Sequence, residues 1–121
     1  MKALVCGSRH WTDVVYLNAA LDLMHSKYGF SVLIEGEQRG VDLMARAWAE
    51  MRGLKVEPYE ADWDRYGRAA GPIRNRRMLD EGRPDLVIAF PGGVGTTHMV
   101  RHAERAGVEI CRLRPPPAAK G

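Results

Sequence analysis

The strongest constraint on the fold is a repeated order of segments: a short apolar run, an amphipathic run with helical period, and a glycine. The helical runs are expected over residues 14–28, 41–52, 72–81 and 96–106, each followed by a glycine, the usual helix stop signal. The strands are expected over residues 2–6, 31–35, 54–59, 85–90 and 108–113. Short apolar strands that alternate with helices predict a parallel sheet covered by helices on both faces.

The predicted fold class is therefore α/β, with a five-stranded parallel sheet in a single domain. A chain of 121 residues is long enough for one such domain. We expect it to occupy residues 1–113, with a Pro-rich C-terminal tail over 114–121. If the strand order is 3-2-1-4-5, the first and fourth strands are neighbours where the winding direction reverses, and the loops after them share a ligand-binding crevice.

The loop after the fourth strand is the clearest functional signal. It reads Phe90-Pro91-Gly92-Gly93-Val94-Gly95-Thr96-Thr97 and joins an apolar run to a helix. Glycines at such a junction let a phosphate approach free backbone N–H groups, and we expect some of them to adopt positive φ. Thr96 and Thr97 are expected either to cap the helix or to contact the ligand.

Other expected site residues follow the first three strands. Gly7-Ser8-Arg9 supplies a glycine for close approach, a hydroxyl and a guanidinium. Asp42 has two interpretations: it balances the helix dipole, or it accepts hydrogen bonds from a ribose. Trp63 also has two: a core residue, or a ring that stacks on a base.

A further helix is expected to begin near Pro72, at a first helical position. Arg74 and Asn75 would then lie in its opening turn and point at the crevice.

Charge and composition exclude several classes. The net charge of +3 is too small to predict nucleic-acid binding, although arginines outnumber lysines by fourteen to four. The sequence contains no Gly-x-Ser-x-Gly elbow and no Walker lysine. His98 and His102 lack a third ligand, so neither a metal nor a cofactor is expected. With no membrane-length apolar run or signal pattern, we expect no membrane partner, a cytoplasmic location, and buried, reduced thiols at Cys6 and Cys111.

Five motifs in order resemble the YspA-like branch of the SLOG superfamily: Gly7-Ser8-Arg9, Arg39-Gly40-x-Asp42, Ala61-Asp62-Trp63, Ala70-Gly71-Pro72-x-Arg74-Asn75 and Phe90-Pro91-Gly92-Gly93-x-Gly95-Thr96. These are Rossmann-like domains related to the DNA-processing protein DprA and to the LOG phosphoribohydrolases. The resemblance implies a three-layer fold with strand order 3-2-1-4-5. It also implies binding of a nucleotide or nucleotide derivative, either a mononucleotide or an ADP-ribose-like ligand.

The expected ligand-binding residues combine these motifs with the loop analysis: Gly7, Ser8, Arg9, Gly36, Arg39, Gly40, Asp42, Asp62, Trp63, Gly71, Arg74, Asn75, Pro91, Gly92, Gly93, Gly95, Thr96 and Thr97. The favoured interpretation is a protein that binds, senses or processes such a ligand.

One alternative is an N-glycosidic hydrolase. LOG enzymes cleave the N-glycosidic bond of a nucleoside monophosphate with an arginine and a glutamate, and this chain has His98 where their glutamate stands. The catalytic candidates here are Arg74, Asp42 and Asp62.

The other alternative is a DprA-like DNA-binding module. The sequence argues against nucleic acid as the partner, because basic and aromatic residues do not interleave. The resemblance to LOG proteins also implies a homodimer.

Overall fold

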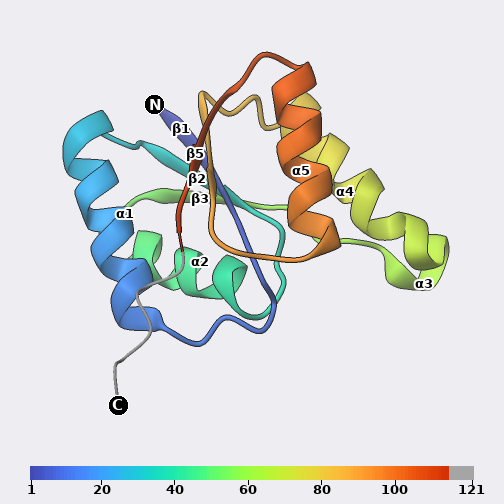
Figure 1. Ribbon diagram of the computed structural model, residues 1–121, viewed down its shortest axis with the longest axis horizontal. Coiled ribbons are helices and arrows are strands. Elements are labelled where there is room, and N and C mark those ends of the chain that lie inside the picture. The colour runs from blue at the N-terminus through green and yellow to red at the C-terminus, as the bar shows by residue number, and fades with distance from the viewer. Residues whose placement is uncertain (115–121) are drawn as a thin grey trace.

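The five strands form one parallel sheet in the order β3-β2-β1-β4-β5, so the predicted fold class and strand order are confirmed (Figure 1). The computed structural model describes residues 1–114, and the expected tail lies outside them except for Arg114. The elements in chain order are β1 (Lys2–Cys6), α1 (Val14–Tyr28), β2 (Val32–Glu35), α2 (Val41–Met51), β3 (Lys55–Pro58), α3 (Trp63–Tyr66), a 3₁₀ turn (Gly67–Ala69), α4 (Ala70–Asp80), β4 (Leu86–Ala89), α5 (Val94–Arg105) and β5 (Glu109–Arg112).

Helices cover both faces of the sheet, as the alternation of strands and helices predicts. Ala3 and Val5 of β1 point into a core shared with α1 and α2, whereas Leu4 points into a core shared with α4 and α5. Successive strand residues face opposite sides, so a strand buried on both faces must be apolar throughout. All four residues of β4 are buried, as its place inside the sheet requires.

The helices end near the predicted glycine stop signals, with one exception. The Asp13 carboxylate caps α1 by accepting the N–H of Tyr16, and Gly29 ends this helix in the left-handed conformation. Gly82 does not act in this way after α4, because Arg83 takes the positive φ of 49° instead. A Cβ on Gly82 would lie 2.3 Å from a carbonyl oxygen of α4, so close packing is what requires glycine there.

Some side chains and elements differ from what the sequence pattern predicts. The helical period of residues 14–28 and 41–52 puts Val14 and Met51 on the apolar helix faces, but they are 46% and 82% exposed. Cys6 is a buried free thiol, whereas Cys111 is only half-buried because β5 lies at the sheet edge. Helix α3 and the 3₁₀ turn were not predicted, since this stretch has no apolar periodicity and none of its described residues is buried.

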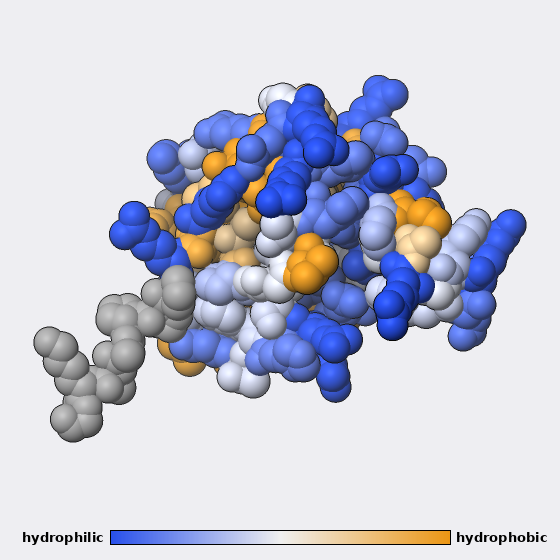
Figure 2. Space-filling model, turned by 45° about the vertical axis from the view of Figure 1, so that its right-hand side comes forward, coloured by the Kyte–Doolittle hydropathy of each residue, from blue (hydrophilic) through white to orange (hydrophobic). Residues whose placement is uncertain are grey.

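Hydrophilic side chains cover much of the face that Figure 2 shows, and apolar residues appear there as separate patches. Among residues 1–114, no helix combines the length and the apolar character needed to cross a lipid bilayer.

Candidate functional site

A pocket of about 550 Å³ opens where β1, β2 and β4 end, the edge at which parallel α/β sheets bind ligands. Its volume lies within the range typical of small-molecule sites. Loops after these strands line it together with the first turns of α2, α4 and α5 and the segment that contains α3. The lining residues are Cys6, Gly7, Ser8, Arg9, His10, Gln38, Asp42, Trp63, Arg68, Gly71, Pro72, Arg74, Asn75, Met78, Gly93, Val94, Gly95, Thr96, His98 and Met99.

Backbone contacts join the loops after β1 and β4 into one wall. The N–H of Ser8 donates to the carbonyl oxygen of Pro91 at 2.9 Å, and the Ser8 carbonyl accepts the N–H of Val41 at 3.2 Å. Gly7 is required because a Cβ there would lie 2.6 Å from a Val41 methyl carbon and 2.8 Å from the Phe90 Cβ. The first loop is therefore held against both the second and the start of α2.

The N-terminus of α5 faces this pocket without a side-chain cap. The helix begins at Val94, and Gly93 at the N-cap position makes no side-chain hydrogen bond. The prediction that Thr96 or Thr97 caps the helix is wrong, because both lie inside its first turns. Unpaired N–H groups and the positive end of the helix dipole make this turn suited to an anion.

Close approach, rather than positive φ, explains Gly92 in this loop, whereas a Cβ on Gly93 or Gly95 would meet nothing within 4 Å. Within residues 1–114, the glycines with positive φ are Gly29, Gly40, Gly53, Gly67 and Gly107. The expectation of positive φ in the loop after β4 is therefore wrong. A Cβ on Gly92 would lie 2.1 Å from the Thr96 hydroxyl oxygen, so only glycine lets the loop fold back onto α5.

Arg74 and Asn75 lie in the second turn of α4, not in its opening turn, because the helix begins two residues before Pro72. Both are buried. Arg74 Nη1 donates to the carbonyl oxygen of Gly36 at 2.6 Å, and its Nε donates to Asn75 Oδ1 at 3.0 Å. These bonds occupy two of the three guanidinium nitrogens of Arg74, which also lines the pocket.

Asn75 links the guanidinium of Arg74 to α5. Its Nδ2 donates to the Gly95 carbonyl oxygen at 3.2 Å and lies 3.3 Å from His98 Nδ1. Burial lowers the pKa of His98, so its ring is neutral at physiological pH. The pocket thus presents one buried guanidinium beside a neutral imidazole and a helix N-terminus.

Asp42 is the acidic residue in the pocket lining. It lies in the first turn of α2 and is 7% exposed, and its Oδ2 accepts the N–H of Gln38 at 3.3 Å. Burial raises the pKa of this carboxyl to about 6, although the charge of Arg74 acts against the rise. A carboxyl with this pKa can accept a hydrogen bond from a sugar hydroxyl or exchange a proton near neutral pH.

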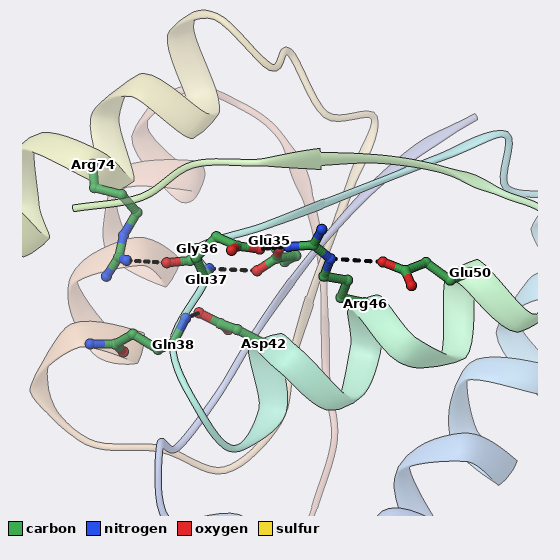
Figure 3. A network of polar contacts seen from close by, with 8 residues as sticks. All are labelled: Glu35, Gly36, Glu37, Gln38, Asp42, Arg46, Glu50 and Arg74. Atoms are coloured by element: carbon green, nitrogen blue, oxygen red, sulfur yellow. Dashed lines mark hydrogen bonds and ion pairs between the residues drawn. The ribbon is translucent and has the colours of Figure 1, made fainter.

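A second acidic group belongs to the polar network drawn in Figure 3 and does not line the pocket. Glu35, at the end of β2, is fully buried, and its Oε2 accepts the N–H of Glu37. Its Oε1 is the buried side-chain atom that lacks a hydrogen-bond partner within the described part of the chain. Burial, and to a smaller extent the nearby Glu37 carboxylate, raises the pKa of Glu35 to about 9, so it is protonated at neutral pH.

Glu37 points along α2, away from the pocket lining. Its carboxylate pairs with Arg46 at 2.5 Å, and Arg46 Nε also donates to Glu50 at 2.7 Å (Figure 3). Glu37 has a positive φ of 61°, which is uncommon for a residue with a side chain. Sequence reasoning did not single out Glu35, although a carboxylate that directly follows an apolar strand was a signal that it would be buried.

The pocket brings together many of the expected ligand-binding residues: Gly7, Ser8, Arg9, Asp42, Trp63, Gly71, Arg74, Asn75, Gly93, Gly95 and Thr96. Trp63 is 48% exposed at this site, so its interpretation as a core residue is wrong. Asp62 instead caps α3 by accepting the N–H of Arg65 at 3.1 Å. The expected residues outside the lining are Gly36, Arg39, Gly40, Asp62, Pro91, Gly92 and Thr97.

Pro91 and Thr97 line a second, smaller hollow of about 400 Å³ on the other side of the loop after β4. The residues that line the main pocket but were not expected there are Cys6, His10, Gln38, Arg68, Pro72, Met78, Val94, His98 and Met99. Within residues 1–114, no group of three or more His, Cys, Asp or Glu side chains is placed to hold a metal ion.

Comparisons with known proteins show the family and the fold. A model of the YspA, cpYpsA-related SLOG family matches residues 1–66. The chain is 39% identical over 118 residues to the Gene 61 protein of Mycobacterium phage D29, an alignment that covers 90% of this chain and 93% of that protein.

Among solved structures, the chain is similar to DNA processing protein A (DprA) from Streptococcus pneumoniae, with a TM-score of 0.51 and 18% identity. That match covers 91% of this chain and 58% of DprA, so the chain spans little more than half of DprA's length. A likeness at this identity shows the fold alone.

Proposed function

The chain belongs to the YspA, cpYpsA-related SLOG family, and on this basis we propose that its domain binds a nucleotide or nucleotide derivative in the pocket beyond β1 and β4. One observation carries the proposal: the uncapped N-terminus of α5 and the buried guanidinium of Arg74 line the same pocket. A helix N-terminus and an arginine both favour a phosphate, and the attraction of each to the anion is stronger where water is excluded.

The remaining lining residues fit the other parts of such a ligand. Ser8 and Arg9 lie on the loop beside the phosphate position and supply a hydroxyl and a second cation. Asp42, which lines the pocket, would accept hydrogen bonds from a ribose, and the half-exposed ring of Trp63 offers a surface for a base. The ligand class that satisfies all these groups is a mononucleotide or an ADP-ribose-like compound.

A negative charge added at the N-terminus of α5 tests the phosphate site. A side chain on Gly95 would meet nothing within 4 Å, so Gly95→Asp leaves the packing intact and places a carboxylate where the phosphate is expected. Gly95→Ala is the matched control. We expect calorimetric titration with AMP and ADP-ribose to detect binding to the wild type and to Gly95→Ala, and at least about a tenfold loss in Gly95→Asp. Equal affinity in both variants would refute the phosphate position.

The pKa of Asp42 predicts how this affinity depends on pH. A carboxylate in the pocket repels an anion, and protonation near pH 6 removes that charge. We expect the affinity for ADP-ribose, whose pyrophosphate bridge keeps its two negative charges in this range, to increase as the pH falls from about 7 to about 5. Asp42→Asn should bind as tightly at neutral pH as the wild type does at low pH, and should lose the pH dependence. The same pH dependence in Asp42→Asn would assign the titration to another group.

A second candidate function is cleavage of the ligand's N-glycosidic bond. Asp42 supports it, because the structure places a carboxyl with a pKa of about 6 in the pocket that also contains Arg74. If the protein is a hydrolase, chromatography of a mixture with AMP should show adenine accumulating over hours. Asp42→Asn should stop that release while AMP binding remains. If AMP binds and stays intact, the hydrolase is refuted and ligand binding remains as the function.

A nucleic acid is the rival partner, because the fold is shared with a DNA processing protein. Binding of single-stranded DNA that weakens steeply with salt and is insensitive to Gly95→Asp would favour it over the nucleotide. The cytoplasmic location and the homodimer stay predictions, and light scattering on the purified protein tests the second.

A further inference from the structure

The segment from Asp62 to Ala69 stands apart from the body of the domain. All eight of its residues are exposed, while Ala61 and Ala70 on either side are buried at 7% and 1% exposure. Figure 1 shows α3 at the edge of the molecule, next to the N-terminal end of α4. Helix α3 packs mainly against the 3₁₀ turn and α4. A segment with buried anchors and few tertiary contacts opens at a low cost in free energy.

Two side chains of this segment nevertheless reach the pocket. Trp63 and Arg68 line it, one from α3 and the other from the 3₁₀ turn. The Trp63 ring lies over Gly71 at the start of α4, with a ring carbon 3.4 Å from where a Cβ would stand. Its 48% exposure leaves a large aromatic surface in contact with water at the mouth of a polar site.

Gly67 separates these two side chains and allows the segment to bend. Its backbone has φ 56° and ψ −131°, a conformation essentially restricted to glycine. A Cβ there would meet nothing within 4 Å, so the packing does not require a glycine at this position. The backbone conformation is thus the feature that requires glycine, at the junction of α3 and the 3₁₀ turn.

We propose that residues 62–69 form a cover that closes over the pocket and selects a phosphate-bearing ligand that also carries an aromatic base. Closure places the Trp63 ring on the base and brings the Arg68 guanidinium to the anionic or carbonyl groups beside it. Stacking on tryptophan accepts any planar base but gains little from a sugar phosphate that lacks one. The inference rests on the proposed phosphate site and goes further, because it makes closure of residues 62–69 the step that recognises the base and rejects a phosphosugar.

Hydrogen exchange with two matched probes tests the cover. AMP and ribose 5-phosphate share the sugar and the phosphate and differ in the base. We expect both to bind, detected by calorimetry, and only AMP to slow amide exchange in the peptide that spans residues 62–69. AMP that binds while exchange in this peptide stays as in the free protein would overturn the cover and leave the phosphate site standing. A failure of both probes to bind would overturn the proposed function together with the cover.

Substitutions on the segment give a second readout. Trp63→Ala should weaken AMP binding about tenfold or more and leave ribose 5-phosphate binding unchanged, because only AMP has a base to stack. Tyr66→Ala is the matched control: Tyr66 is 41% exposed on the same short helix but lies outside the pocket lining. Equal losses for both probes in Trp63→Ala, or an AMP loss of the same size in Tyr66→Ala, would overturn the assignment of the base to Trp63.

Discussion

Replacing Glu35 by glutamine should make the protein more stable, and the gain should grow with pH. Glu35 is fully buried and keeps its proton up to about pH 9 in the folded protein. In the unfolded chain the same carboxyl ionises near its ordinary value of 4.5. Between these two values the folded state holds one more proton than the unfolded state, so a rise in pH favours unfolding. Glutamine has the shape of the protonated acid and carries no charge at any pH, and its amide oxygen can accept the N–H of Glu37 as Glu35 Oε2 does.

The size of the effect follows from this difference of one proton. Each pH unit inside the window lowers the free energy of unfolding of the wild type by about 1.4 kcal/mol through Glu35, and leaves this contribution constant in the variant. The difference between Glu35→Gln and the wild type should therefore grow by about 3 kcal/mol from about pH 5.5 to about pH 7.5. For a domain of this size, that is a large part of the total stability.

Urea unfolding followed by circular dichroism at several pH values measures this difference directly. Glu50→Gln makes the same chemical change at an exposed position of the same polar network, and it should alter stability by less than about 1 kcal/mol at every pH. If the difference between Glu35→Gln and the wild type does not change with pH, Glu35 is already ionised in the folded protein. The reasoning from its burial would then be refuted.

Two further predictions compare glycines in pairs. Gly40→Ala should cost about 3 kcal/mol of folding stability, because Gly40 has φ 81° and its Cβ would lie 2.4 Å from the Ser8 carbonyl oxygen, whereas Gly29→Ala, with φ 70° and open space, should cost about 1 kcal/mol. Urea denaturation of both variants checks this order, and equal costs would contradict it. Gly92→Ala should lower the melting temperature by several degrees, because its Cβ would lie 2.1 Å from a hydroxyl oxygen of α5, whereas Gly93→Ala meets nothing within 4 Å and should shift it little. A lower melting temperature for Gly93→Ala than for Gly92→Ala would show that the loop packs differently.

The architecture could be predicted from the sequence because it depends on local, periodic signals. Strand β1 and helix α1 have the bounds that the apolar pattern and the flanking residues predict, and the other predicted ends differ from the structure by at most two residues. Short apolar strands that alternate with helices leave few solutions apart from a parallel sheet with two covered faces. That order also placed the loops after β1 and β4 at one crevice, so the position of the pocket was predictable.

The sequence by itself determined the strands, the helices, their order and the glycine loops, since each depends on neighbours a few residues away. Only the tertiary structure decided which side chains meet: that two nitrogens of Arg74 hold Gly36 and Asn75, and that Glu35 is buried without charge. It also decided that Trp63 stands half exposed at the pocket rather than in the core. These outcomes depend on contacts between segments far apart in the chain and on the exclusion of water from the space between them, and neither leaves a periodic signal in the sequence.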